Sequence, residues 1–184
     1  MTNYQSKIEQ FAVTAEQMRQ IEERIFVAGM PVAALMEKVA SLIARRIQEL
    51  YPLKGNHNHP PITNYQLPIT NYQIGILVGP GHNGGDALVV ARELHFQGYK
   101  VAVYLAFPKL KELTSQHARY ARSIGITFVE QIEQLQDCDI IIDGLFGFGL
   151  ERPLSDSIAD AINQLNSWSK PIISIDIPSG LDTD

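Results

Sequence analysis

The N-terminal part of the chain carries apolar residues at the spacing of two consecutive helices. Thr14 and Gln17 form a capping-box pattern, in which two side chains satisfy free N–H groups at a helix start. The apolar positions of the first helix recur with a helical period: Met18, Ile21, Ile25 and Phe26. Pro31 suits the first turn of a second helix. Its apolar positions are Leu35, Met36, Val39, Ile43 and Ile47. We therefore expect two helices, the first ending near Gly29, ahead of any strand.

From Ile74 onward, short apolar runs alternate with amphipathic segments. The apolar runs predict five strands, at Ile74–Val78, Val101–Ala106, Ile126–Val129, Asp139–Asp143 and Pro171–Ile177. The segments between them predict a helix carrying Leu88, Val89, Ala91 and Leu94, a helix around His117 to Ile124, and a helix from Ser155 to Leu165. Strands separated by helices pair in parallel through right-handed crossovers. The sequence thus predicts an α/β fold, a doubly wound Rossmann-like three-layer sandwich with a mostly parallel sheet in the order 3-2-1-4-5.

Residues 52–73 interrupt this pattern with a short repeat. Leu67–Gln73 repeats Pro60–Gln66 with one change, and Thr2–Gln5 carries its last four letters again. Two copies are too few for a solenoid, and the prolines oppose both a helix and a central strand. We interpret 52–73 as an exposed loop insertion before the first strand, within a single domain spanning residues 1–184. A proline-rich docking peptide is the alternative, disfavoured because the segment lacks Pro-x-x-Pro spacing.

Composition and charge narrow the classes of partner. With 184 residues, 45% of them hydrophobic, the chain is long enough for one ordinary domain with a buried core. The net charge of −5, with basic residues paired only at Arg45-Arg46 and Lys109/Lys111, disfavours nucleic acid and anionic membranes and favours a small molecule. The single Cys138, beside an apolar run, is expected to be a buried structural thiol. Lacking a signal-peptide pattern or an apolar stretch of ~18 residues, the chain is expected to be cytoplasmic.

Turns rich in glycine or acidic residues follow three of the predicted strands. They are Gly79–Asp86, Asp143–Leu150 and Asp176–Gly180. Ligands of such sheets bind outside the carboxyl ends of the strands, where the strand order reverses, so we expect the three turns to share one crevice. A P-loop is excluded because Asp86 stands where a lysine would follow the last glycine. An ordinary dehydrogenase is excluded because Val101–Ala106 ends without the acidic residue that holds a ribose hydroxyl.

The polar side chains of these turns allow two interpretations. Asn83, Asp143 and Ser179 are oxygen donors with a single carboxylate, a set that suits a monovalent cation better than calcium or magnesium. The same residues equally fit a structural role, with Asn83 and Ser179 capping helices and Asp143 accepting backbone N–H bonds. Asp176 is the candidate for proton transfer, because the end of a buried strand would raise its pKa. A turn-forming aspartate before Pro178 is the alternative that the pattern alone favours.

Taken in order, the turns Gly79–Asp86, Asp143–Gly149 and Asp176–Thr183 resemble the signature turns of the NAD(P)H-hydrate epimerases, the YjeF N-terminal family. The helical pair joined by Gly29-Met30-Pro31 is similar as well. The resemblance implies an isomerase that interconverts the R and S forms of NADHX and NADPHX, which are reduced nicotinamide cofactors hydrated at C6 of the ring. It also implies a homodimer. The implied functional partner is an ADP- or ATP-dependent NAD(P)HX dehydratase specific for the S form, often fused to the epimerase domain.

The resemblance also assigns roles to residues. Asp176 would hold or deprotonate the reacting part of the substrate, and one potassium ion per subunit would be bound by Asn83, Asp143 and Ser179. The substrate-binding residues carried over by position are His82, Asn83, Gly84, Gly85, Asp86, Gly147, Phe148, Gly149, Leu150, Glu151, Arg152, Pro153 and Asp176. His82 stands where the family usually has asparagine. Because family members continue beyond the third turn, we expect the chain to be incomplete at its C-terminus.

Two other classes of function stay open beside epimerisation. A non-catalytic nucleotide- or protein-binding scaffold of the same fold would keep the crevice without the chemistry. A nucleotide-dependent transferase would use the same crevice for a different nucleotide. Both differ from the epimerase in what they bind, so a substrate assay separates the three.

Overall fold

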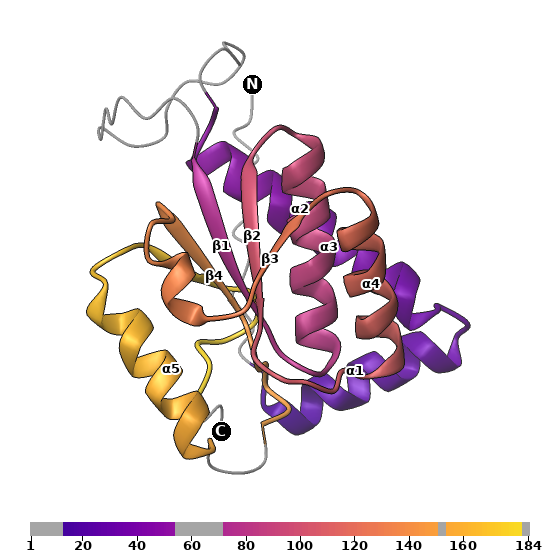
Figure 1. Cartoon of the computed structure of the whole chain (residues 1–184). Coiled ribbons are helices and arrows are strands. Elements are labelled where there is room, and N and C mark those ends of the chain that lie inside the picture. The colour runs from indigo at the N-terminus through magenta and orange to yellow at the C-terminus, as the bar shows by residue number, and fades with distance from the viewer. Residues whose placement is uncertain (1–12, 54–71, 151–153, 182–184) are drawn as a thin grey trace, which may run out of the picture.

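The computed structural model describes residues 13–53, 72–150 and 154–181, and shows a parallel sheet between layers of helices (Figure 1). The helices are α1 (Ala15–Val27), α2 (Val32–Leu50), α3 (His82–Phe96), α4 (Glu112–Ser123) and α5 (Asp156–Ser167), with the short 3-10 helix η1 (Ile132–Leu135). The strands are β1 (Gln73–Val78), β2 (Lys100–Leu105), β3 (Thr127–Val129), β4 (Ile140–Gly144) and β5 (Ile172–Ser174). All four strand pairings are parallel, and the order β3-β2-β1-β4-β5 confirms the predicted order and fold class.

The strand β1 lies at the centre of the sheet and at the point where the strand order reverses. Ile74 pairs with Val101 of β2 on one side and with Ile140 of β4 on the other. At the carboxyl end, Val78 pairs with Gly144, the last residue of β4. The chain runs outward from β1 to β3, then returns to the other side of β1 to form β4. The carboxyl ends of β1 and β4 therefore frame the crevice in which ligands of this fold bind.

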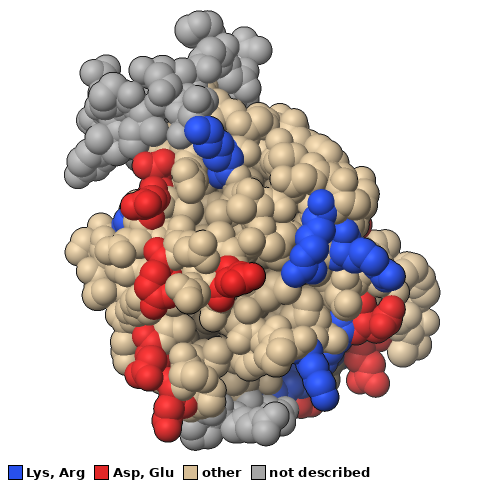
Figure 2. Space-filling model, in the orientation of Figure 1, with Lys and Arg blue, Asp and Glu red and all other residues tan. Residues whose placement is uncertain are grey.

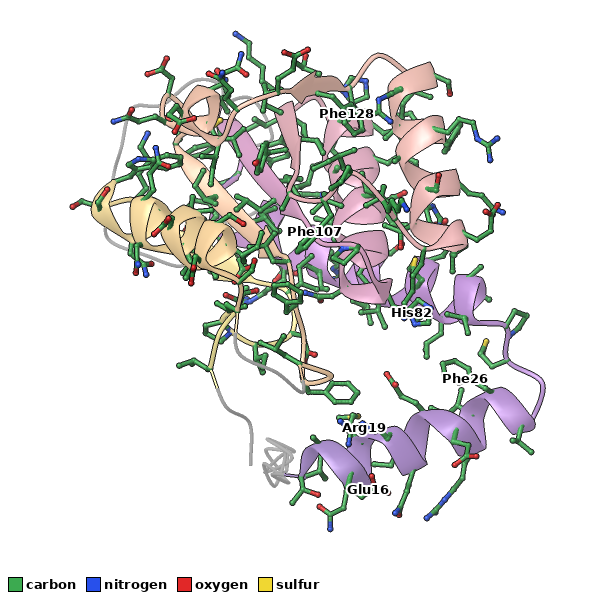
Figure 3. All side chains as sticks on the ribbon, turned by 60° about the horizontal axis from the view of Figure 1, so that its bottom comes forward. Glu16, Arg19, Phe26, His82, Phe107 and Phe128 are labelled. Atoms are coloured by element: carbon green, nitrogen blue, oxygen red, sulfur yellow. The ribbon has the colours of Figure 1, made fainter. Side chains whose placement is uncertain are left out.

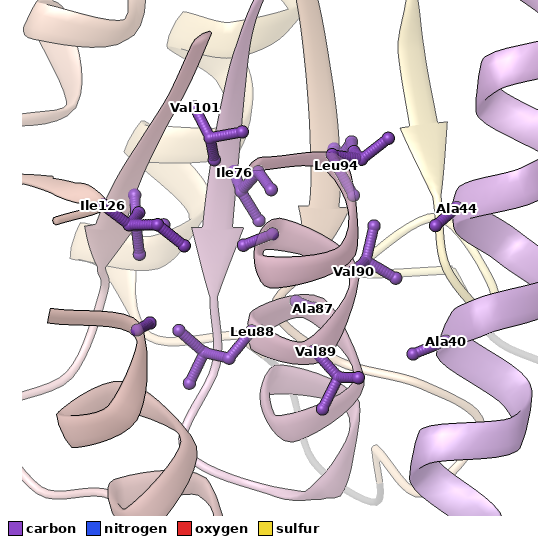
Figure 4. Close-up of a cluster of buried hydrophobic side chains, with 14 of the residues drawn as sticks. Ala40, Ala44, Ile76, Ala87, Leu88, Val89, Val90, Leu94, Val101 and Ile126 are labelled. Carbon is purple, nitrogen blue, oxygen red and sulfur yellow. The ribbon is translucent and has the colours of Figure 1, made fainter. Parts of the chain in front are cut away.

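Helices cover both faces of the sheet. The adjacent residues Ile76 and Leu77 of β1 belong to two different buried clusters, because successive side chains of a strand point to opposite faces. On the Ile76 face, α3 packs against the sheet and is itself covered by α2 (Figure 4). The α2 contact uses Ala40 and Ala44, which let the two helix backbones approach closely. On the Leu77 face, the buried cluster is completed by residues of α5 and η1. The result is the predicted three-layer sandwich.

The two N-terminal helices form as their sequence predicts. The Thr14 hydroxyl accepts a hydrogen bond from the Gln17 backbone N–H at 3.2 Å, and the Gln17 side chain accepts one from the Thr14 N–H at 2.9 Å. Gly29, at φ 99°, ends the first helix in the left-handed region that favours glycine. Pro31 differs slightly from expectation: it is the extended N-cap of α2 and not a residue of its first turn. In Figure 1, α1 runs across the carboxyl ends of the strands instead of packing on a face of the sheet.

The last strand, β5, is shorter than the predicted run Pro171–Ile177. Only Ile172–Ser174 pair with β4, and within the described residues β5 lies at the edge of the sheet. Ile172 is 36% exposed, so the expectation of a buried strand is wrong here. The sequence of a short apolar strand does not show whether the strand lies at the edge or at the centre of a sheet, because composition does not reveal how many neighbouring strands pair with it. The chain therefore leaves the sheet before it reaches Asp176.

The segment between β3 and β4 contains one element that the sequence pattern did not reveal. The short helix η1 places Leu135 over Cys138, and both side chains are fully buried. Burial raises the pKa of the Cys138 thiol to about 11, which fits the predicted structural role. The repeat of residues 52–73 lies almost entirely outside the described residues, so its interpretation as a loop insertion stays a prediction.

Charged side chains of both signs lie on the face drawn in Figure 2. Acidic side chains gather toward the side of α5 and η1, and basic side chains toward the side of α4. Neither sign forms a continuous stripe among the described residues of this face. Within the described chain, no single helix is both long and apolar enough to cross a membrane. The consecutive helices α1 and α2 reach that length and composition only together, with a bend of 120° between them.

Candidate active site

A cleft of about 590 Å³ lies at the carboxyl ends of the strands, within the range of roughly 300–1,000 Å³ typical of small-molecule sites. All three predicted turns contribute to its wall. The lining residues are Glu22, Val39, Pro80, Gly81, His82, Asn83, Asp86, Lys111, Leu145, Phe146, Gly147, Phe148, Gly149, Leu150, Ile175 and Asp176. The expectation that the turns share one crevice is therefore confirmed in the structure.

The first turn is packed directly against the second. The Gly79 N–H donates to the Gly144 carbonyl at 3.0 Å, which continues the pairing of β1 and β4 beyond the strands. A Cβ atom on Gly79 would lie 1.8 Å from the Leu145 carbonyl oxygen, so only glycine fits. From the other side, the Thr114 hydroxyl of α4 donates to the Gly81 carbonyl at 2.7 Å. The start of α3 is thereby fixed between two neighbouring elements.

The predicted substrate residues of this turn divide into two groups. His82, Asn83 and Asp86 line the cleft. Gly84 and Gly85 do not line it: they are buried, the first against the Gly79 carbonyl and the second against the Met36 side chain. Their lack of a side chain serves the packing of α3 under the turn and onto α2.

Asp143 joins the second turn to the third. Its Oδ1 accepts hydrogen bonds from the Leu145 N–H at 3.1 Å and the Ser179 hydroxyl at 2.7 Å. Its Oδ2 accepts from the Ser179 N–H at 2.8 Å and from the Ser174 hydroxyl at 3.3 Å. The Ser179 hydroxyl in turn accepts from the Phe146 N–H at 3.0 Å. Because Asp143 and Ser179 are only 7% and 8% exposed, this network is a buried link between the turns after β4 and β5.

The structure gives the three polar residues Asn83, Asp143 and Ser179 different surroundings. Asp143 accepts backbone N–H bonds, as the structural interpretation expected, but neither of the other two residues caps a helix within the described parts of the chain. Ser179 bonds to Asp143, and Asn83 lies inside the first turn of α3, whose N-cap is Gly81 without a side-chain bond. The Asn83 Nδ2 is buried and has no hydrogen-bond partner among the described residues. Asn83 lines the cleft, and its Nδ2 donor capacity is unused by the described residues.

Asp176 projects from the third turn into the same cleft. Its Oδ2 accepts a hydrogen bond from the Phe148 N–H at 2.8 Å. A Cβ atom on Gly147 would lie 2.2 Å from that oxygen, so a larger residue there would displace the Asp176 carboxylate. Asp176 is exposed and lies two residues beyond β5, which corrects the expectation that it ends a buried strand. The geometry holds this carboxylate at the cleft by a backbone bond and not by burial.

Asp86 is a half-buried carboxylate of the cleft. Its pKa is raised from 3.8 to about 7, first by burial and then by the negative charges of Asp176 and Glu22. Burial also raises the pKa of Glu22, followed by the charge of Asp176. His82, on the first turn of α3, has its pKa lowered by burial and then by the Lys111 charge. The cleft thus combines three acidic groups with a basic pair at the start of α3 and α4.

Four lining residues lie outside the three predicted turns. Ile175 belongs to the run predicted as the last strand, and the other three are Glu22 of α1, Val39 of α2 and Lys111 at the start of α4. Glu22 reaches the cleft because α1 crosses the strand ends. Figure 3 shows Phe26 of α1 pointing toward the end of α3 that carries His82. Lys111 is the N-cap residue of α4, and its N–H donates to the Pro80 carbonyl at 2.8 Å. No local pattern distinguishes these positions from an ordinary polar or apolar helix face. The predicted residues Glu151, Arg152 and Pro153 lie outside the described residues.

The fold and the site define a doubly wound α/β protein with a ligand cleft at its switch point. The chain belongs to the family described as "YjeF-related protein N-terminus", whose sequence profile matches residues 32–184. The family resemblance of the three turns is thereby confirmed.

Related proteins agree with this assignment. The chain is 48% identical to the "Bifunctional NAD(P)H-hydrate repair enzyme Nnr" of Thermosynechococcus vestitus, over 94% of this chain and 31% of that protein. It is 32% identical to the "NAD(P)H-hydrate epimerase" of Limosilactobacillus fermentum, over 94% of this chain and 76% of the relative. The crystal structure of yeast ynu0 superposes with a TM-score of 0.80 at 25% identity, covering 95% of this chain and 73% of the yeast chain. The chain therefore spans less than a third of its bifunctional relative.

Proposed function

We propose that this chain is an isomerase that interconverts the R and S forms of NADHX and NADPHX in the repair of nicotinamide cofactors. The observation that carries the proposal is the convergence of the three signature turns on one cleft that also holds the carboxylates Asp86 and Asp176. Family membership and the relative named NAD(P)H-hydrate epimerase support it. A non-catalytic scaffold is less favoured, because a binding module has no need for acidic groups held at the base of a nucleotide cleft.

The substrate is proposed to lie along the cleft with its two ends in different electrostatic surroundings. The first turn of α3 contains no acidic residue, and His82 and Lys111 line the cleft at the starts of α3 and α4, which suits the diphosphate. The carboxylates of the cleft suit the hydrated ring, which carries the reacting C6 and no phosphate. Asp176 holds or deprotonates that part of the substrate.

A potassium ion bound by Asn83, Asp143 and Ser179 is part of the proposal. The donor set fits such an ion, because it has one carboxylate among neutral oxygens and the buried Asn83 carboxamide has no partner for its nitrogen. A half-turn of the Asn83 carboxamide exchanges its nitrogen and oxygen, so that the oxygen takes the position of the unpartnered nitrogen. The two orientations have nearly the same shape. When bound, potassium supplies a positive charge that offsets buried Asp143. The three turns are then held in a fixed arrangement around the substrate.

The proposed partners follow from the chemistry. Epimerisation has value only if another enzyme consumes one epimer, so we propose an ADP- or ATP-dependent dehydratase specific for the S form as the functional partner. The name of the bifunctional relative supports a fusion of the two activities in one polypeptide. We also propose a homodimer in the cytoplasm. The exposed apolar side chains of α1, with Ile21 at 41% and Val27 at 83%, offer a surface for self-association.

A coupled assay tests the proposed activity. An R/S mixture of NADHX is treated with an S-specific dehydratase until only the R form remains, and recovery of NADH absorbance is then followed after adding the chain. We expect the recovery rate to rise with the amount of chain, to be higher in potassium than in sodium, and to fall at least ~100-fold for Asp176→Asn. Asp160→Asn, at an exposed position of α5 away from the cleft, is the matched control and should keep full activity. A folded wild-type chain that gives no acceleration over dehydratase alone contradicts the proposal.

A further inference from the structure

Three carboxylates reach the cleft from three separate elements: Glu22 from α1, Asp86 from the second turn of α3, and Asp176 from the turn after β5. None of them forms an ion pair with another described residue. Asp176 alone has a hydrogen bond, from the Phe148 N–H. The basic groups of the cleft are His82 and Lys111, and the charge of Lys111 acts on His82. The acidic groups therefore act mainly on one another.

The three carboxylates stand in unequal surroundings. Asp86 is the most deeply placed, and burial together with the charges of Asp176 and Glu22 brings its pKa to about 7. Asp176 is exposed and accepts a hydrogen bond from the Phe148 N–H. Adjacent carboxylates whose surroundings differ in this way commonly divide the roles of acid and base.

We propose that Asp86 is the proton donor in the epimerisation and that Asp176 is the proton acceptor, with Glu22 keeping Asp86 protonated. This inference rests on the proposed function. It adds a second catalytic residue to that function, and a positioning residue on α1 that lies outside all three signature turns.

The proposed step exchanges the hydroxyl at C6 for a water molecule on the opposite face. Asp86 gives its proton to the C6 hydroxyl, the C6–O bond breaks, and its electron pair leaves on the oxygen of the departing water. The ring nitrogen lone pair forms a double bond to C6, which leaves a positive charge on the ring. Water then adds to C6 from the other face while Asp176 takes its proton. Exchange with solvent returns the proton from Asp176 to Asp86, and no oxidant or reductant is needed.

The acidic surroundings serve this route in a second way. The intermediate ring carries a positive charge, and the carboxyl groups of Asp176 and Glu22 line the same cleft and stabilise it. The uncharged hydrated ring gains less from those groups, so the stabilisation is larger after the bond has broken. Glu22 therefore acts on both the donor and the intermediate without touching a reacting atom.

The test compares pH profiles of kcat/KM for the wild-type chain, Asp86→Asn and Glu22→Gln, with Glu23→Gln as the control on the adjacent, exposed position of α1. For the wild type, we expect kcat/KM to fall about tenfold per pH unit above pH 7, as the donor ionises. Asp86→Asn should lose at least ~100-fold in kcat and still bind the R/S mixture within about threefold by calorimetry. Glu22→Gln should move the alkaline fall to lower pH, because removing one negative neighbour makes Asp86 easier to ionise.

The outcomes separate this inference from the proposed function. An inactive wild-type chain overturns the function itself. An active wild type with Asp86→Asn within threefold of it overturns the donor role of Asp86. If Asp86→Asn does not fold, Glu22→Gln decides: an alkaline limb at the same pH as in the wild type and in Glu23→Gln overturns the inference, and a limb shifted to lower pH supports it.

Discussion

The Ser179 hydroxyl donates to Asp143 Oδ1 at 2.7 Å, and this buried contact ties the turn after β5 to the end of β4. The same hydroxyl accepts from the Phe146 N–H, so one serine satisfies a charged acceptor and a backbone donor. The ligand cleft depends on the contact, because Phe146 lies in its wall and Asp176 stands three residues before Ser179.

Removing this hydroxyl should therefore loosen two turns together. For Ser179→Ala we expect a loss of about 2 kcal/mol in the free energy of unfolding, since a buried carboxylate and an N–H each lose a partner. Urea unfolding at pH 7 measures the loss. Ser174→Ala is the matched control: its hydroxyl donates to the same carboxylate at 3.3 Å, so a smaller loss is expected. Equal losses for the two variants would show that the number of hydrogen bonds to Asp143, and not the link that Ser179 makes between the turns, determines the free energy of unfolding.

Alanine substitutions at Gly79 and Gly81 test how closely the first two turns are packed. A Cβ atom at Gly79 would overlap the Leu145 carbonyl oxygen, whereas one at Gly81 meets nothing within 4 Å, and Gly81 has an ordinary φ of −98°. We expect Gly79→Ala to destabilise the fold by about 3 kcal/mol and Gly81→Ala to change it little. Thermal and urea unfolding measure both. A Gly79→Ala chain as stable as wild type would mean that the turns move apart at little cost.

Much of this fold could be predicted because it follows from local chemistry and chain topology. The Thr14/Gln17 capping pair, the helical periods and the apolar runs each act over a few residues, and the right-handed crossover rule converts them into a strand order. The position of the cleft followed from the same rule, since the switch point between β1 and β4 is a property of that order.

The acid–base character of the site could not be predicted, because it depends on burial by elements distant in sequence. Asp176 was expected to be desolvated and is exposed, since β5 ends early at an edge of the described sheet. Asp86 stands in a glycine-rich turn that looked like a binding loop, and its depth arises from packing around α3. Glu22 reaches the cleft only through the course of α1 across the strand ends, which no pattern within α1 encodes.

The contact between α2 and α3 includes an ion pair that should contribute measurably to stability. The Arg92 side chain is 11% exposed and forms a two-bond contact with Glu37 of α2, one bond at 3.0 Å, while Tyr120 of α4 lies beside its guanidinium. For Glu37→Gln we expect a loss of about 2 kcal/mol in the free energy of unfolding, below the about 3–5 kcal/mol of fully buried pairs because Glu37 is 43% exposed.

A second acidic residue of α2 provides the control for this pair. Glu49 contacts Arg45 and Arg46 on the exposed surface of the same helix, so Glu49→Gln should leave the unfolding curve nearly unchanged. Denaturant unfolding of the two variants under identical conditions makes the comparison. Similar small effects for both would mean that water replaces Glu37 around Arg92, and that the α2–α3 contact rests on Ala40 and Ala44 instead.

The raised pKa of Asp86 predicts that this residue lowers the free energy of unfolding at neutral pH. The folded chain holds this proton up to about pH 7, whereas the unfolded chain releases it near the ordinary value of 3.8. Raising the pH through that window therefore destabilises the folded state, and above the folded-state pKa the full cost is present. Asn does not ionise, so Asp86→Asn should match wild type near pH 4, become progressively more stable relative to it up to pH 7, and then keep a constant advantage.

A shift of about three units corresponds to at most roughly 4 kcal/mol, and we expect about half of that because water enters the cleft. Urea unfolding of both chains from pH 4 to 9, with the exposed Asp160→Asn as control, measures the difference, and a difference that does not vary with pH would show that Asp86 ionises as easily in the folded chain as in the unfolded one.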